Sequence, residues 1–237
     1  GNGIGLTGLD KNALFKVQAV AANSWLQYQR AHGVANPKVG LAASGAVNSD
    51  VLCRTNQVIR LTLQYNGVVA NAAYGSASAS KTNTADNVGW GNVPYLTSVD
   101  SAYENWSSSS AAFQGKSTTL TAAQVKEGIE KILGAGATNN YSYAKWITDV
   151  KTDASGYCTS VKLCGTVISG NRFYQDLKGL RSPNFKVTYN NDGTWTFVTY
   201  GNGNCVGLSQ YGAAGYIANS YNWRWVLLHY FPGTVIS

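Results

Sequence analysis

The sequence predicts a single α+β domain with mixed sheets, several helices and a small helical insertion. Residues 10–31 repeat apolar side chains at helical spacing, whereas residues 57–73 and 146–200 contain short β-rich runs separated by turn residues. The two patterns do not alternate strictly as βαβ units do, and this mixture is typical of the α+β class. We expect the domain to span residues 1–237, with the insertion around 101–143.

The first helix is expected from Asp10, as its N-cap, to about Ala31. Gly33 ends it, and Pro37 prevents its continuation. The strands of residues 57–73 follow it.

Asn66-Gly67 is a strong hairpin signal between the β-rich residues 58–65 and 68–70. Residues 75–92 are rich in Ser, Ala, Thr, Asn and Gly and predict a long surface loop. So long a loop inside a compact domain is more often functional than accidental.

A second helix is expected over 122–133, with Thr121 as its cap and Gly134 as its stop. Four strands and then two helices complete the chain. The strands cover 146–150, 157–163, 166–168 and 185–200, the last interrupted by a turn at 190–193, and the helices cover 209–218 and 223–230.

The composition excludes several classes of protein. A hydrophobic content of 44% excludes disorder, and no apolar run approaches the ~20 residues of a membrane span. The 18 Lys and Arg exceed the 11 acids and give a net charge of +7. This charge would suit an anionic partner, but the basic residues are scattered singly, so we expect no nucleic acid as a partner.

The four cysteines are Cys53, Cys158, Cys164 and Cys205. The separation of Cys158 and Cys164 fits a bridge across a short hairpin, and Cys53 and Cys205 would then pair, although the sequence allows three pairings. Without a CxxC motif, and with two lone histidines, a zinc site is poorly supported. Because the chain opens on Gly1-Asn2-Gly3 and not on Met, we expect a processed, secreted protein with disulfides.

Five blocks of the sequence resemble motifs of one known family. Residues 201–213 resemble GxGHGxGMSQYGA, 227–234 resemble ILxHYYPGT, 16–25 resemble KAQAVAARSY, 94–100 resemble PYLxSVxD and 177–185 resemble LGLRSxxF. In their order along the chain, the five blocks are similar to the stage II sporulation protein D / amidase enhancer LytB (SpoIID/LytB) family.

The resemblance implies a SpoIID/LytB-like fold and a secreted bacterial protein that acts on cell-wall glycan. Sporulation members of the family are lytic transglycosylases, which cleave glycan between sugars without water, whereas other members enhance an amidase. We therefore expect a polysaccharide partner, peptidoglycan or another glycan including an acidic one, with no cofactor or metal, and a monomer.

The departures from the family's motifs concern its chemistry. The family's catalytic Glu falls at Gly5, and residues 1–9 contain no acid. The His of GHG is Asn204, the Gly after it is Cys205, and the Arg of "AAR" is Asn23. The carboxyl group of a transglycosylase must therefore come from another position.

Four residues are candidates for catalysis. Asp10 is the acid nearest to Gly5, but it could instead cap the helix. Glu104 follows the 94–100 block and is otherwise a solvated loop acid. Tyr74 and Tyr211 could remove the α-proton of a uronic acid, or could simply pack.

A larger set could bind substrate through hydroxyl, amide or cationic groups, and it comprises Lys16, Gln18, Ser24, Ser76, Ser78, Tyr95, Arg181, Ser209 and Gln210. For Ser209 the alternative is a helix cap, and for Gln18 it is a bond to a buried backbone group. Exposed tryptophans would stack on the apolar faces of sugar rings. The candidates for stacking are Trp90, Trp106, Trp146, Trp223 and Trp225.

The function expected from these residues is the cleavage of glycosidic bonds without water, by transglycosylation or by β-elimination, so that the chain would be a carbon–oxygen lyase. One alternative is a noncatalytic glycan-binding enhancer of a wall hydrolase. A glycoside hydrolase is the other, although it would need two partnered carboxyl groups.

Overall fold

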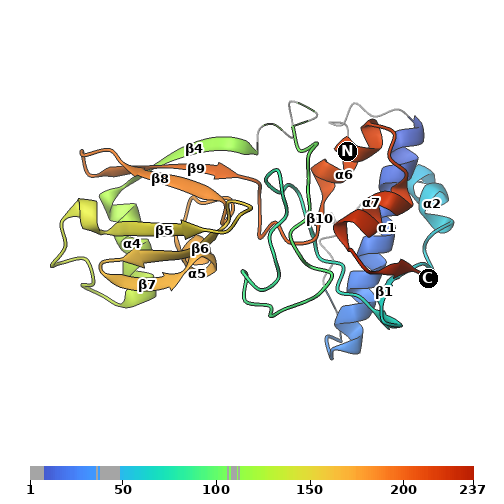
Figure 1. Ribbon diagram of the computed structural model, residues 1–237, viewed down its shortest axis with the longest axis horizontal. Coiled ribbons are helices and arrows are strands. Elements are labelled where there is room, and N and C mark those ends of the chain that lie inside the picture. The colour runs from blue at the N-terminus through green and yellow to red at the C-terminus, as the bar shows by residue number, and fades with distance from the viewer. Residues whose placement is uncertain (1–7, 36, 38–48, 106, 108–110, 112) are drawn as a thin grey trace.

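The computed structural model describes residues 8–35, 37, 49–105, 107, 111 and 113–237. Its helices and small sheets form a mixed α+β fold, which confirms the predicted class. Figure 1 shows two lobes along the longest axis, with helices α1, α6 and α7 in one and most strands in the other. We call the first the helical lobe and the second, residues 114–200, the sheet lobe.

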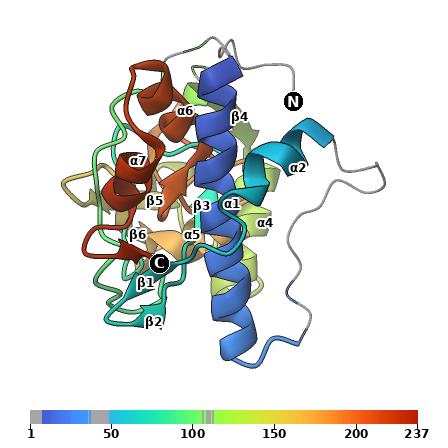
Figure 2. The same ribbon diagram turned by 90° about the vertical axis from the view of Figure 1, so that its right-hand side faces the viewer.

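The helical lobe is built around α1 (Gly8–Ala31), the longest helix. Helices α6 (Gln210–Ala218) and α7 (Trp223–Tyr230) pack against it, and Figure 2 shows α2 (Ser49–Asn56) on its other side. Their apolar faces are buried in one cluster, which includes Val17, Val20, Leu227 and Phe231. The predicted helices 10–31, 209–218 and 223–230 are thus confirmed, whereas α2 was not predicted.

Two small sheets close the helical lobe. Strand β1 (Leu63–Tyr65) pairs with β2 (Val68–Val69) and with β11 (Val235–Ile236), both antiparallel. Asn66 and Gly67 have φ angles of 51° and 78°, as a two-residue hairpin requires, so the predicted turn is confirmed.

Strand β3 (Tyr74–Gly75) runs parallel to β10 (Leu208–Ser209). Isolated bridges from Ala77 to Asn202 and from Asn83 to Val206 extend this contact. The long loop predicted at 75–92 is therefore held against the Gly-rich segment 201–209, although the two are far apart in the sequence.

The sheet lobe contains two antiparallel three-stranded sheets, in the orders β4-β9-β8 and β5-β6-β7. Their strands are β4 (Gln114–Thr121), β5 (Ile147–Thr152), β6 (Cys158–Leu163), β7 (Thr166–Ser169), β8 (Phe185–Tyr189) and β9 (Thr194–Tyr200). Helices α4 (Ala122–Leu133) and α5 (Gly170–Asp176) pack against each other, and a short 3-10 turn, η1 (Tyr143–Lys145), precedes β5.

Helix α4 begins and ends at the residues that the sequence predicts. The Thr121 hydroxyl accepts from the Gln124 amide while the Gln124 side chain accepts from the Thr121 amide, and this capping box satisfies two amides of the first turn. Gly134, with φ 103°, ends the helix. Within the range 101–143, which we expected to form an insertion, β4 and α4 share a hydrophobic core with the rest of the sheet lobe.

The lobes meet at a third, small hydrophobic cluster of Ala79, Tyr157 and Cys205. The Tyr157 hydroxyl accepts a hydrogen bond from the Ala79 amide (3.2 Å) and donates one to the Lys81 carbonyl (2.8 Å). Tyr157 belongs to the sheet lobe, and Ala79 and Lys81 belong to the loop beside the helical lobe. This junction positions the pocket described below.

All four cysteines are free thiols, so the predicted disulfides are wrong. Cys158 begins β6 and Cys164 directly follows its end, which puts their Cα atoms about 20 Å apart, because a strand rises about 3.3 Å per residue. A disulfide needs Cα atoms within about 7 Å. Cys53 is exposed on α2, whereas the buried Cys205 thiol donates to the Ala77 carbonyl at 3.4 Å.

Candidate functional site

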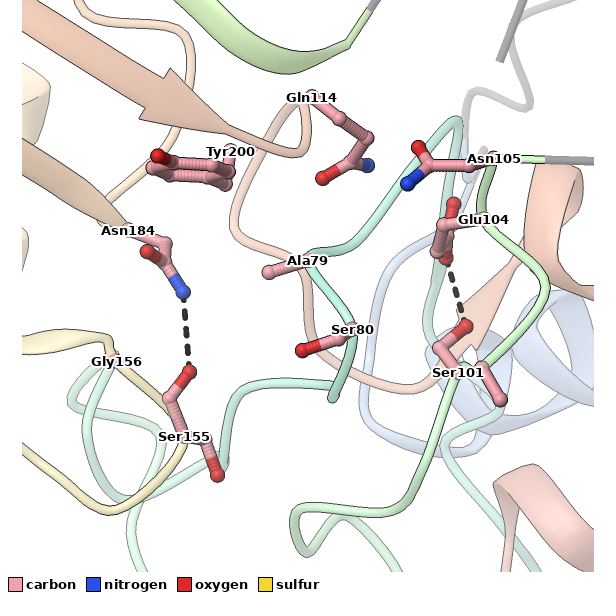
Figure 3. A pocket seen from close by; sticks show the side chains of 11 residues that line it. Ala79, Ser80, Ser101, Glu104, Asn105, Gln114, Ser155, Gly156, Asn184 and Tyr200 are labelled. Carbon is pink, nitrogen blue, oxygen red and sulfur yellow. Dashed lines mark hydrogen bonds between the residues drawn. The ribbon is translucent and has the colours of Figure 1, made fainter. Parts of the chain in front are cut away.

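Two pockets lie on either side of the segment 76–79. The junction pocket, of about 380 Å³, lies between the lobes and is lined by Ser80 and Glu104 on one side and by Asn184 and Tyr200 on the other. Figure 3 shows these side chains around the opening, with Gln114 above it. The helix pocket, of about 410 Å³, lies beside α1 and the start of α6.

Glu104 supplies the carboxyl group in the wall of the junction pocket. Glu104 belongs to the segment that precedes the sheet lobe, and the residue is only 2% exposed. Oε1 accepts hydrogen bonds from the Ser78 amide (3.1 Å), the Ser78 hydroxyl (2.7 Å) and the Ser101 hydroxyl (2.7 Å). Oε2 is buried and has no hydrogen-bond partner among the described residues.

Burial raises the pKa of Glu104 above its ordinary value of 4.5, although hydrogen bonds from Ser209, Ser78 and Ser101 oppose the rise. The group therefore keeps its proton to a higher pH than an exposed glutamate does. A protonated carboxyl group can donate through its second oxygen, and the bare Oε2 is the oxygen that would do so. The alternative of a solvated loop acid is wrong for this residue, because its side chain is buried.

A chain of hydroxyl groups continues from Glu104 into the helical lobe. The Ser101 hydroxyl lies 2.6 Å from the hydroxyl of Tyr230, which is fully buried in α7. Since Ser101 donates to Glu104, Tyr230 is the donor to Ser101. The chain fixes the carboxyl group in one orientation.

Gly212 permits this arrangement because it has no side chain. A Cβ atom built there would lie 2.2 Å from the Tyr230 hydroxyl, 2.3 Å from the Ser101 hydroxyl and 2.8 Å from Glu104 Oε1. The first turn of α6 can thus approach the hydroxyl chain closely. Ser209 caps the same helix by accepting from the Gly212 amide at 3.1 Å, as its alternative interpretation predicts.

The helix pocket gathers amide and aromatic groups. The Gln210 side chain donates to Gln18 at 2.9 Å, and the Asn202 side chain donates to the Ser76 hydroxyl at 2.8 Å. Phe113 and Tyr211 face each other with ring centroids 5.4 Å apart. Among the described residues, the linings of both pockets lack Lys and Arg.

The structure brings some of the predicted site residues together. Gln18, Ser76, Gln210 and Tyr211 line the helix pocket. Ser78 and Ser209, both buried, contact Glu104 behind the junction pocket.

Other predicted residues lie away from both linings. Asp10 is inside the first turn of α1, which begins at Gly8, so it is not the N-cap. Tyr74 pairs with Leu208 in the parallel bridge, and burial raises the pKa of its hydroxyl, which disfavours a role as a base. Lys16 is half-buried on α1.

Three further candidates have structural contacts. The buried Ser24 hydroxyl donates to the Val20 carbonyl at 2.6 Å and accepts from the Leu63 amide at 2.8 Å. The Tyr95 hydroxyl accepts from the Asn71 amide at 2.9 Å. The Arg181 guanidinium lies 5.9 Å from the centroid of the Phe113 ring, next to the helix pocket.

Several positions discussed from the sequence lie outside the described residues, among them Gly5 and Trp106. Many residues that line or support the pockets were not predicted, among them Ser101, Gln114, Asn184, Tyr200 and Tyr230. Ser101 directly follows the 94–100 block and Tyr230 lies within 227–234, so proximity to these blocks was the available signal. Nothing in the sequence singles out Gln114.

No group of three or more His, Cys, Asp or Glu side chains in the described part of the chain is arranged to hold a metal ion. None of the helices that the structure describes has the combination of length and hydropathy needed to cross a bilayer.

Comparison with known proteins identifies the class. No protein-family model matches the chain, but a curated relative does, and the chain is related to the stage II sporulation protein D (SpoIID) family. That relative is stage II sporulation protein D of Bacillus subtilis (strain 168), which is 31% identical over 176 residues, or 74% of this chain. The match covers 47% of the relative, so the chain spans about half the length of the curated protein.

Proposed function

We propose that this chain is a secreted protein that binds a polysaccharide of the cell wall, or another extracellular glycan, in the two pockets and breaks glycosidic bonds in it without water. The observation that carries the proposal is Glu104, a residue that lines the junction pocket and has a buried carboxyl group with a raised pKa, whose Oε2 has no hydrogen-bond partner among the described residues. The family relationship supports a role in cell-wall metabolism, since the relative is named for a stage of sporulation.

A single carboxyl group is sufficient for this chemistry. The protonated Glu104 donates its proton to the oxygen of the leaving sugar as the glycosidic bond breaks. The carboxylate then accepts a proton from a hydroxyl group of the remaining sugar, whose oxygen bonds to the anomeric carbon, so that an anhydro end forms and no water is consumed. The proton returns to Glu104 and the group is ready for another cycle.

We favour this transglycosylation over β-elimination on a uronic acid. A cationic group neutralises a sugar carboxylate better than an amide does, and the two pocket linings contain amide side chains but no Lys or Arg among the described residues. Hydrolysis needs a second carboxyl group. Within the described part of the chain, the lining of the junction pocket contains no carboxyl group other than that of Glu104.

A noncatalytic glycan-binding role is the second candidate. The observation that favours it is the 2% exposure of Glu104, which leaves little of the carboxyl group open to a substrate. The other groups in the two linings are amides, hydroxyls and rings, which suit binding to neutral sugars.

The test is to incubate the protein with purified peptidoglycan and with uronate-containing polysaccharides and to analyse the products by mass spectrometry. Anhydro ends on peptidoglycan are expected, and Glu104→Gln should abolish them while glycan binding persists. Glu127→Gln is the matched control, because Glu127 is an exposed acid of α4 that pairs with Lys178. Products that carry one added water, or full activity of Glu104→Gln, would contradict the proposal. Retained binding without any product would support the noncatalytic alternative.

A further inference from the structure

An aromatic surface on the helical lobe continues from the junction pocket. Trp225 and His229 lie one turn apart on α7, and Tyr221 lies four residues before Trp225, ahead of the helix; neighbouring ring centroids are 4.5 and 4.7 Å apart. Tyr103 joins the row, 6.1 Å from Tyr221. We call these four side chains the aromatic ribbon.

The ribbon is open to solvent at its centre. Trp225 is 42% exposed and Tyr221 is 37% exposed, whereas Tyr216 behind them is 4% exposed. The Tyr216 ring supports the ribbon, with its centroid 5.0 to 5.3 Å from those of Tyr103, Tyr221, Trp225 and His229. Exposed rings on such a fixed base lose little conformational entropy when they bind a ligand.

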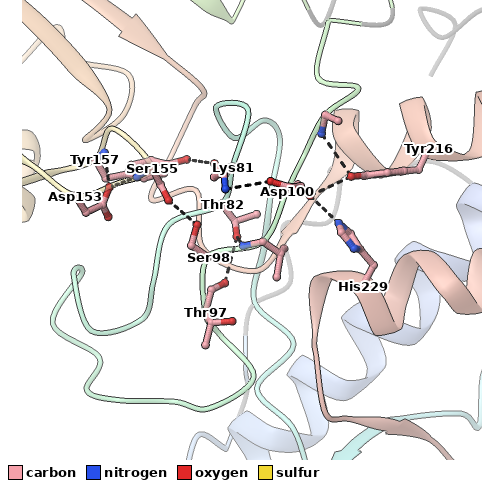
Figure 4. Close-up of polar contacts among 12 residues, drawn as sticks. Lys81, Thr82, Thr97, Ser98, Asp100, Asp153, Ser155, Tyr157, Tyr216 and His229 are labelled. Carbon is pink, nitrogen blue, oxygen red and sulfur yellow. Dashed lines mark hydrogen bonds and ion pairs between the residues drawn. The ribbon is translucent and has the colours of Figure 1, made fainter.

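Hydrogen bonds connect the ribbon to the wall of the junction pocket. The backbone carbonyl of Asp100 lies 2.6 Å from His229 Nε2 and accepts from the Tyr216 hydroxyl at 3.2 Å, as Figure 4 shows. The next residues, Ser101 and Ala102, line the pocket, as does Glu104, two residues after Ala102. A ligand chain that leaves the pocket on this side therefore meets the ribbon.

The chemistry of the ribbon favours a sugar polymer over an aliphatic partner. Its exposed side chains are mostly aromatic, and the apolar surface of an aromatic ring matches the apolar C–H faces of sugar rings. The Asp100 carboxylate and Lys81, paired at 3.3 Å and both well exposed, provide acceptors and donors for hydroxyl groups beside His229. Leu228 is the one large aliphatic side chain on α7 that is exposed.

We propose that the aromatic ribbon is an accessory binding surface for a neutral polysaccharide, which stacks on Trp225 and Tyr221 while an adjacent part of the same chain occupies the junction pocket. This inference rests on the proposed function, since it names a second contact of the same polymer. It predicts that the protein prefers long glycan chains to short fragments, because a short fragment fills the pocket without reaching the ribbon.

The experiment measures the affinity for peptide-free peptidoglycan strands, in long and short fractions, by isothermal titration calorimetry. All variants carry Glu104→Gln, so that no strand is cut during the titration. Trp225→Ala is expected to weaken binding of long strands about tenfold and to leave short strands unaffected. Trp225→Phe, which keeps a ring, should restore most of the affinity.

Trp90→Ala is the matched control, because Trp90 is 46% exposed and lies in the loop, away from the ribbon. Equal affinity of Trp225→Ala and Trp90→Ala for long strands would overturn the inference while leaving the proposed function intact. A change in sedimentation of Trp225→Ala without a change in strand affinity would overturn it in favour of a contact between copies of the chain. Absence of strand binding by every variant, including the Glu104→Gln parent, would overturn the proposed function as well.

Discussion

Glu104 is held between two opposing influences. Burial raises its pKa above 4.5, whereas the hydroxyl groups of Ser209, Ser78 and Ser101 stabilise the charged form and oppose that rise. The balance favours the proton, so the folded protein binds it more tightly than the unfolded chain does. At neutral pH, Glu104 therefore lowers the free energy of unfolding.

The sign of this effect predicts how the stability of a variant depends on pH. As pH rises from about 4.5 towards the higher folded pKa, the unfolded chain loses the proton first, so the free energy of unfolding decreases. Glu104→Gln has no carboxyl group at this position, so its stability does not decrease in this way. The melting temperature of the variant, minus that of the native protein, should therefore increase between pH 4 and 8. Thermal melts across this range measure the difference.

Glu127→Gln is the control for that measurement, since the hydrogen bond and charge of Lys178 lower the pKa of Glu127 in the folded protein. The melting temperature of Glu127→Gln, minus that of the native protein, should decrease over the same pH range or stay constant. If Glu104→Gln and the native protein keep a constant difference in melting temperature, the carboxyl group does not retain its proton on folding.

Gly212 gives a second prediction at this scale. A methyl group at this position would overlap the hydroxyl groups of Tyr230 and Ser101, so Gly212→Ala should lower the free energy of unfolding by about 1–3 kcal/mol. Urea denaturation measures this change. Gly75→Ala is the control, because the nearest atom to its Cβ would be 3.8 Å away, in ordinary contact. Equal stabilities of the two variants would mean that the hydroxyl chain moves aside without cost.

Among the elements, strand β6 keeps Cys158 and Cys164 too far apart to form a disulfide. The five residues that follow Cys158 in β6 separate it from Cys164, and burial raises the pKa of the Cys158 and Cys205 thiols to about 12. Without any reductant, an aromatic disulfide reagent should therefore react quickly with Cys53 alone in the folded protein. It should react with all four thiols after unfolding. Fewer than four thiols in the unfolded protein would indicate a disulfide.

Local signals explain which elements could be predicted. Helix α4 has a capping box and a terminal glycine, and the hairpin at Asn66-Gly67 has its own turn residues, so their bounds follow from the sequence. Helix α5 begins with Gly170 and Asn171, which are poor helix formers. It forms because Phe173 is fully buried and Gly170 packs directly on Cys158, and these are tertiary contacts.

The same distinction between local signals and tertiary contacts applies to the candidate site. Gln18, Gln210 and Tyr211 lie in blocks that resemble family motifs, and Ser76 lies in the loop predicted at 75–92; the fold brings these four residues into one pocket. The burial of Glu104 depends on Ser78, which is 26 residues away, and on the approach of α6. No local pattern around Glu104 records those partners, so the sequence alone was equally compatible with a solvated acid.

At the scale of the whole molecule, Tyr157 connects the lobes. Its hydroxyl binds both Ala79 and Lys81, and Tyr157→Phe would leave that buried amide and carbonyl without this partner. We expect the free energy of unfolding to decrease by about 1–3 kcal/mol and the Ala79 amide to exchange hydrogen faster. Native-state hydrogen exchange measures both quantities. Tyr143→Phe, at a residue 45% exposed, should change neither. Unaltered exchange at Ala79 in Tyr157→Phe would show that the Tyr157 hydroxyl does not hold the lobes together.

The two pockets approach each other at the start of β4. Phe113 lines the helix pocket, while the next residue, Gln114, lines the junction pocket and donates to the Ser78 carbonyl at 2.7 Å. A change in the backbone at residues 113–114 therefore moves one lining residue of each pocket at the same time, so that the two pockets are coupled through this one position.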